Sequence, residues 1–140
     1  MNTRHVPSLE LCQEFDRLCK EKGIVVPDTE FVWYKSCFED DCEFVLMQSK
    51  GFYGHSAPLV SELGEWLPET VEMYNEGEDV ECFLTYLKGH QKRHRVDYLM
   101  IGGQATTMEL WEADTEANAR QKMLNYLIAE GIITTLCQPT

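Results

Sequence analysis

The sequence has no long apolar run and no leader-like N-terminus. Its longest apolar runs, such as residues 44–47 and 98–101, contain four residues, whereas a helix that spans a bilayer needs about 20. The first residues also lack the apolar segment of a secretory signal peptide. We therefore expect a cytoplasmic protein that has no contact with membranes.

Signatures of catalysis are absent as well. The sequence contains no Gly-x-Ser-x-Gly elbow, no Walker loop, no His-Glu-x-x-His helix and no Gly-x-Gly-x-x-Gly turn. Cys82 and His90 could be combined as a nucleophile and its base, but Cys82 lies in an apolar stretch typical of a core strand. These observations favour a protein without enzymatic activity and without a cofactor.

Positive charge is scarce in the middle of the chain. Residues 24–87 contain two basic residues, Lys35 and Lys50, against 14 acidic ones, which accounts for the whole net charge of −12. A negative field repels phosphate backbones, so direct nucleic-acid binding is disfavoured. A protein partner with a basic surface is favoured instead.

The remaining composition is that of one folded domain. The chain has 140 residues, of which 44% are hydrophobic, and this is enough for a single core. Its six cysteines, in a chain without an export signal, are expected to be reduced thiols rather than a disulfide framework. Cys12 and Cys19 fall on the apolar stripe of a helix, so we expect both in the core.

Two helices have recognisable ends. Ser8 is suited to cap the start of a helix over Leu9–Lys22, and Gly23 to end it. A second helix is predicted over residues 116–130, with Asp114 or Thr115 as its N-cap and Gly131 after its end. A short central helix is expected from Ser56, with Pro68 ending or kinking it.

The strands form hairpins in this prediction. Strands at 31–38 and 43–48 are joined by a tip, and the second is apolar on both faces, which suggests that it is covered on both sides. Strands at 80–87, 95–101 and 107–111 form a meander, and 132–136 is a last short strand. The fold class is therefore α+β, with antiparallel hairpins and a meander packed by an N-terminal and a C-terminal helix.

The last third of the chain carries a recognisable unit. Residues 111–119, Trp-Glu-Ala-Asp-Thr-Glu-Ala-Asn-Ala, and 123–133, Met-Leu-Asn-Tyr-Leu-Ile-Ala-Glu-Gly-Ile-Ile, combine a strand, an acidic cap and a helix ending at glycine. With residues 63–68, Leu-Gly-Glu-Trp-Leu-Pro, this unit resembles parts of small uncharacterised phage and prophage proteins. The resemblance implies a phage or mobile-element origin and brings no catalytic residue with it.

Four residues have the spacing of a zinc site. Cys37 and Cys42 form a C-x4-C pair at one hairpin tip, and His90 and His94 form an H-x3-H pair at another. Zinc would bind there only if the two tips met in space. The alternative is a cross-strand cysteine pair and two solvated histidines.

A second candidate is the basic tip, a cluster of six cationic or imidazole side chains in one short segment. Its members are Lys88, His90, Lys92, Arg93, His94 and Arg95. The basic tip could bind phosphate or an anionic nucleotide, or dock on the acidic middle of another copy. The alternative is a solvated hairpin end that prevents edge pairing.

A third candidate is an acidic partner surface. Five glutamates recur at intervals of three and four, which places them on one side of a helix if Pro68 only kinks it. With the hairpin tip, the set is Glu39, Asp40, Asp41, Glu62, Glu65, Glu69, Glu72 and Glu76. The alternative is the ordinary solvated face of an amphipathic segment.

The leading hypothesis is a non-enzymatic phage or prophage accessory protein that acts through protein–protein contact and forms a homodimer. The runner-up is a protein that binds a small anionic ligand at the basic tip. A small metal-stabilised domain is the third hypothesis.

Overall fold

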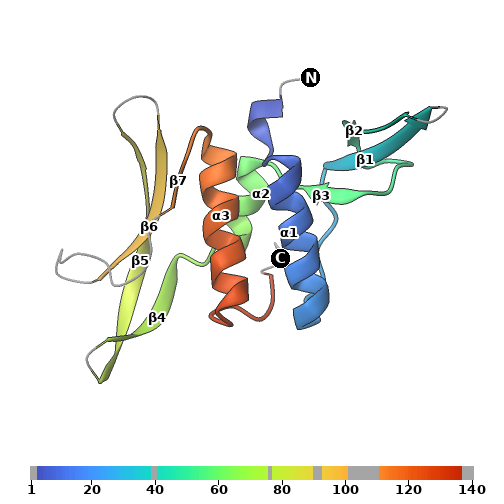
Figure 1. The fold of residues 1–140 in the computed structure, drawn as a ribbon. Helices are drawn as coiled ribbons and strands as arrows, with labels where there is room; N and C mark the ends of the chain where they lie inside the picture. Colours follow the sequence, from blue (N-terminus) through green and yellow to red (C-terminus); the bar gives the residue numbers. More distant parts are fainter. Residues whose placement is uncertain (1–2, 39–40, 76, 90–92, 101–110, 137–140) are drawn as a thin grey trace.

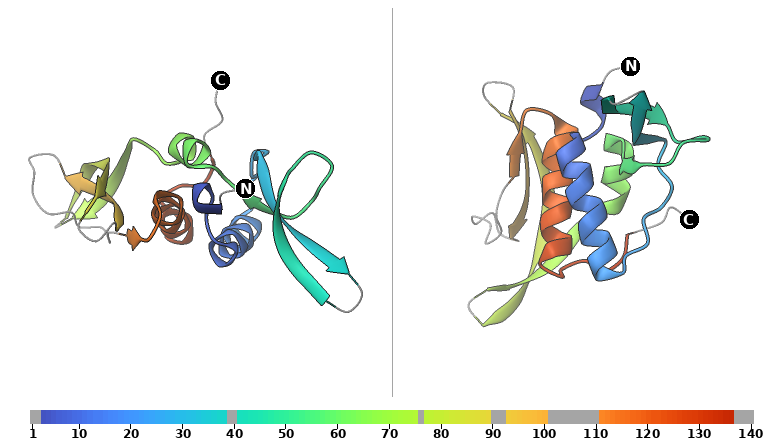
Figure 2. Two further views of the ribbon diagram at one scale, coloured as in Figure 1. Left: turned by 90° about the horizontal axis from the view of Figure 1, so that it is seen from above. Right: turned by 45° about the vertical axis from the view of Figure 1, so that its right-hand side comes forward.

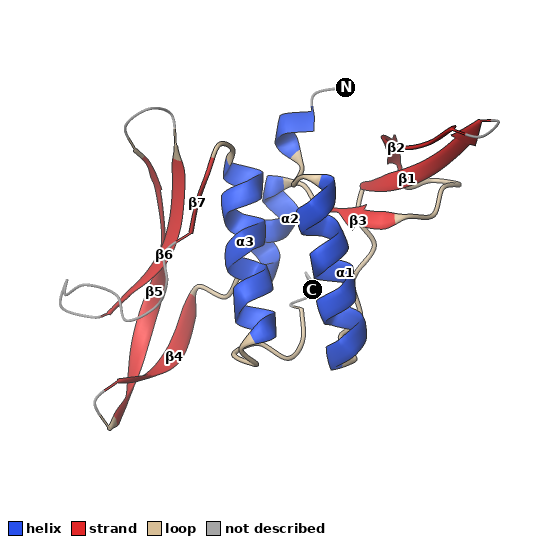
Figure 3. Ribbon diagram, viewed as in Figure 1, coloured by secondary structure: helices blue, strands red, loops and turns tan. Residues whose placement is uncertain are grey.

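Three helices lie between two antiparallel sheets in the computed structural model (Figures 1 and 3). The structure describes residues 3–38, 41–75, 77–89, 93–100 and 111–136. Seen from above, the helices separate a smaller sheet, ordered β2-β1-β3, from a larger one, ordered β4-β5-β6-β7 (Figure 2). This α+β arrangement is the predicted fold class.

The first long helix, α1 (Leu9–Lys22), has the predicted ends. The Ser8 hydroxyl accepts a hydrogen bond from the backbone N–H of Leu11, and Gly23 has a φ of +70°. This left-handed backbone conformation ends the helix, and glycine adopts it with little strain because it has no Cβ. A single 3₁₀ turn (Thr3–His5) precedes this helix.

The smaller sheet has β1 (Phe31–Phe38) in its centre, between β2 (Asp41–Gln48) and β3 (His55–Ala57). The predicted hairpin is confirmed, but β2 is an edge strand. Its residues Phe44 to Met47 are half-buried, so the expectation of cover on both sides was wrong. The smaller sheet is tied to α1 by His55, whose Nδ1 lies 2.6 Å from a carboxylate oxygen of Asp16.

The central helix, α2 (Val60–Trp66), begins after Leu59, because Ser56 belongs to β3 and caps nothing. Pro68 ends the helix instead of kinking it, and the chain continues as β4 (Thr70–Asn75). Proline has no N–H for the next helical hydrogen bond, and the Thr-Val pair after it favours a strand.

The meander is confirmed in the larger sheet. Its strands are β5 (Glu78–Lys88), β6 (His94–Met100) and β7 (Trp111–Ala113), with β4 added beside β5. The β4 strand was not expected from the sequence. Of the predicted third strand, 107–111, only Trp111 is among the described residues, and it begins β7.

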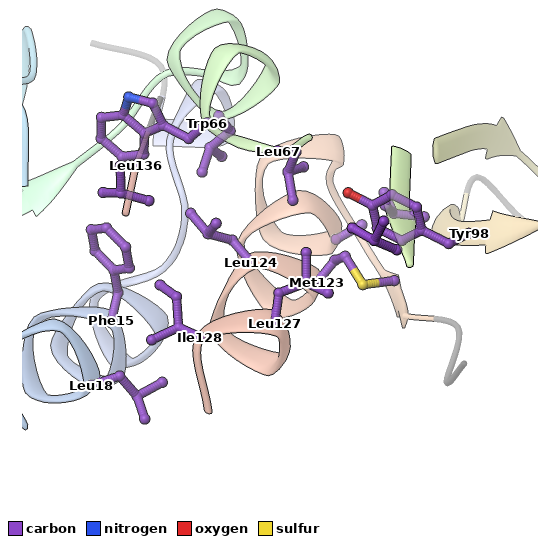
Figure 4. Close-up of a cluster of buried hydrophobic side chains, with 14 of the residues drawn as sticks. Phe15, Leu18, Trp66, Leu67, Tyr98, Met123, Leu124, Leu127, Ile128 and Leu136 are labelled. Atoms are coloured by element: carbon purple, nitrogen blue, oxygen red, sulfur yellow. The ribbon is translucent and has the colours of Figure 1, made fainter. Parts of the chain in front are cut away.

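The last helix, α3 (Glu116–Ala129), is the centre of the core. Thr115 caps it by accepting from the N–H of Asn118, and Gly131 follows it with a φ of +72°. Its buried side chains face α1 and α2 on one side and the larger sheet on the other (Figure 4). They meet the stacked rings of Phe15 and Trp66, whose centroids lie 5.8 Å apart.

Two details complete the fold. Residues 132–136 form no strand, but Leu136 is buried against the core, which explains the apolar character that suggested one. Among the described residues, no helix is both long and apolar enough to cross a membrane.

Candidate functional site

The strongest surface feature is the face of the larger sheet that is turned away from the helices, here called the outer sheet face. Side chains alternate across a strand, so Val96 and Tyr98, which are buried toward α3, fix the inner side. The described members of the outer sheet face are Thr70, Glu72, Glu81, Phe83, Thr85, Leu87, Arg95, Asp97, Leu99 and Glu112. This face points away from α3 in Figure 1.

The middle of the outer sheet face is partly apolar. Phe83 is 44% exposed and Leu87 is 58% exposed, although their neighbour Cys82, on the inner side, is completely buried. Leu99 lies directly opposite Phe83 on β6 and is half-buried. Large apolar side chains gathered on one solvent-facing surface are typical of a contact surface.

A buried carboxylate lies between these apolar residues. Asp97 is 2% exposed, and it accepts hydrogen bonds from Arg95 through Nε at 3.1 Å and Nη2 at 3.0 Å. The hydroxyl of Thr85, opposite it on β5, also donates to it. A buried charge is tolerated only when it is paired and hydrogen-bonded, so this trio fixes the centre of the face.

One end of the face is acidic. Glu72 on β4 and Glu81 on β5 lie directly opposite each other, and both are exposed. Like charges in this cross-strand position destabilise a sheet. Within the described part of the chain, neither carboxylate forms an ion pair.

The other end of the face is basic and coincides with part of the basic tip. Arg93 is exposed and its Nε lies 3.7 Å from a carboxylate oxygen of Glu112. Lys88 is exposed at the end of β5, but it alternates with Leu87 and is directed to the other side of the strand. His90 and Lys92 lie outside the described residues.

The other described members of the basic tip have internal partners. Arg95 is bound to Asp97, and the Nδ1 of His94 lies 2.5 Å from the hydroxyl of Tyr86. The guanidinium of Arg120 stacks over the Tyr86 ring at 5.2 Å and pairs with Glu116. These contacts leave less positive charge available for an anionic ligand than the sequence suggests.

The structure does not bring the predicted acidic surface together. The helix ends at Trp66, so the regular glutamate spacing does not form one helical stripe. Glu62 is half-buried, and its carboxylate accepts hydrogen bonds from the N–H groups of Leu59 and Glu30. The bond from Leu59 makes Glu62 part of the cap of α2 rather than of an exposed acidic surface. Burial raises the pKa of this carboxyl, and the two hydrogen bonds that it accepts oppose the rise.

The other members of that set are dispersed. Glu65 and Glu69 are exposed near the end of α2, Glu72 is on the larger sheet, and Asp41 begins β2 on the smaller sheet. The two sheets lie on opposite sides of the helices (Figure 1). Glu39, Asp40 and Glu76 lie outside the described residues.

The predicted zinc ligands do not meet either. Cys37 and Cys42 are directly opposite each other on β1 and β2 and form a disulfide, so the expectation that all the cysteines are reduced was wrong. His94 is on the larger sheet, across the helices from this pair, and His90 is not described (Figure 1). Among the described residues, no three potential ligands cluster.

Cys82 is a core residue, as its apolar stretch predicted. It is fully buried between the sheet and the helices, and burial raises the pKa of its thiol. An inaccessible thiol with a raised pKa is a poor nucleophile.

Sequence reasoning did not find the outer sheet face. Its signal is the alternation of Phe83, Thr85 and Leu87 with residues that are buried on the other side of β5. That alternation has large apolar residues on both sides of the strand, so it cannot show which side the helices cover.

Comparisons with protein-family models, with curated proteins and with solved structures find no match to this chain.

Proposed function

We propose that this protein acts by binding another protein, without catalysis, and that the outer sheet face is its contact surface. The observation that supports this proposal is the exposure of Phe83 and Leu87 on the side of the sheet that none of the described helices covers. Burying such side chains against a partner removes apolar surface from water, which is the main favourable term in protein association.

The surface also has the composition of a binding site. Its apolar residues surround the Arg95–Asp97–Thr85 trio, and charged residues lie at both ends. Large apolar side chains inside a charged rim are typical of protein interfaces, while the trio at the centre differs from the usual apolar centre and is paired within its own chain. The setting of a phage or prophage accessory protein in the host cytoplasm is part of the proposal, and the resemblance of the C-terminal unit to phage proteins is its only support.

Site-specific photo-crosslinking in producing cells tests the contact surface. A photoreactive amino acid at position 87 should yield a crosslinked product of one defined mass, and the Phe83→Asp substitution should reduce its yield. The control position is Val25, which is also exposed and apolar but lies in the loop after α1.

Equal crosslinking patterns at positions 87 and 25 would show that the outer sheet face has no specific partner. The proposal would then fail, whatever the mass of the products.

A further inference from the structure

We infer that the partner on the outer sheet face is a second copy of this chain, stacked face to face so that the two β5 strands run in opposite directions. This inference rests on the proposed contact surface and adds its occupant and geometry. The arrangement follows from how the side chains are distributed along β5.

The apolar residues fit a two-fold axis. Phe83 and Leu87 lie two positions on either side of Thr85 and on the same face of the strand, about 13 Å apart in an extended chain. Consider a two-fold axis that lies between the stacked sheets, runs perpendicular to β5 and passes over Thr85. It places Phe83 of each copy over Leu87 of the other. Such an isologous contact is the commonest way in which identical chains associate.

The charges fit the same axis. Running β5 in opposite directions brings the acidic end of each copy, Glu72 and Glu81, toward the basic end of the other, which contains Arg93. Running the strands in the same direction would place carboxylates over carboxylates. Electrostatic complementarity therefore selects the antiparallel stacking.

The acidic end gives a further reason for a cationic neighbour. Glu72 and Glu81 repel each other across the β4–β5 pair and have no cationic partner among the described residues of their own chain. Arg93 is half-exposed and only distantly paired with Glu112, so its guanidinium can turn toward a second copy. The contact relieves a repulsion that a single copy retains.

The centre of the face remains unchanged in this arrangement. Asp97 is already neutralised by Arg95 within one chain, so stacking does not bury an unpaired charge. The exposed charged residues at the two ends form the ion pairs between copies, while burial of the apolar residues contributes most of the free energy of association.

A charge-exchange experiment tests the inference by sedimentation equilibrium. Glu81→Lys and Arg93→Glu should each weaken self-association of the purified protein about tenfold or more, because each variant places like charges against each other in a homodimer. Mixing the two variants should restore an affinity close to that of the wild type. In the mixed dimer, the lysine introduced by Glu81→Lys faces the glutamate introduced by Arg93→Glu, and the unchanged Arg93 of one copy faces the unchanged Glu81 of the other.

The matched controls are Glu65→Lys and Lys50→Glu, which change the same charges at exposed positions outside the outer sheet face. Neither control, alone or mixed, should change the dissociation constant. If Arg93→Glu does not fold, Arg93→Gln removes the same positive charge without placing a second carboxylate beside Glu112, and it should also weaken self-association.

Two results would overturn the inference. A wild-type protein that remains monomeric at millimolar concentration excludes a second copy as the occupant. A dimer that is unaffected by the single variants, or is not restored by mixing them, excludes this stacking. In either case, a crosslinked product from position 87 whose mass is not twice 16.2 kDa would preserve the proposed function with a different partner.

Discussion

At the scale of single residues, the buried thiols show what periodicity predicts well. Cys12 and Cys19 were expected on the core side of α1, and both are buried there. Burial raises the pKa of Cys19 to about 12, with a smaller contribution from the nearby carboxylate of Asp16. The cross-strand position of Cys37 and Cys42 was the stated alternative to a zinc site, but the disulfide between them was not expected, because all the cysteines were predicted to be reduced.

Alkylation of the reduced, native protein near pH 8 should separate the cysteines into two groups. Cys37 and Cys42 are exposed and should react quickly, while Cys12, Cys19 and Cys82 should react at least about 100-fold more slowly. Peptide mapping by mass spectrometry measures each rate, and all five should react at similar rates in denaturant. Native labelling of Cys12 as fast as that of Cys37 would mean that the face of α1 assigned to the core is wrong.

At the scale of elements, the ends of the two long helices were predictable, whereas the start of α2 and the strand that follows Pro68 were not. Ser8, Gly23, Thr115 and Gly131 act where their chemistry predicts, because capping is decided by a few adjacent residues. The glutamate spacing through Pro68 fits a kinked helix as well as it fits a helix followed by a strand. The helix followed by a strand is the structure that forms, because residues 70–75 pair with β5, which lies later in the sequence than the glutamate pattern and is not revealed by it.

The packing of α3 gives a direct stability prediction. Leu124→Ala should lower the free energy of unfolding by about 2–5 kcal/mol, because this side chain is fully buried between α3 and the other helices. Leu87→Ala removes the same atoms from an exposed position and should change it by no more than about 0.5 kcal/mol in a dilute, monomeric sample.

Chemical denaturation monitored by circular dichroism measures both variants. Equal losses of stability for the two substitutions would contradict the assignment of α3 to the centre of the core.

At the scale of the whole molecule, two sheets enclose the helices, and each sheet keeps one side away from them (Figure 2). The sequence predicts that the hairpins and the two long helices pack together, because their apolar sides need a common core. It does not predict which side of β5 the helices cover. That choice depends on α3 packing against Val96 and Tyr98, and it leaves Phe83 and Leu87 on the other side.

The central claim is that a second copy of the chain covers the outer sheet face, and hydroxyl-radical footprinting measures that cover directly. As the concentration of purified protein rises, the oxidation rate of Phe83 should fall severalfold, with a parallel fall at Leu87. Tyr53 is an aromatic residue that is 92% exposed in the loop before β3, and its rate should stay constant. A Phe83 rate that stays as constant as that of Tyr53 over the whole concentration range would contradict self-association through this face.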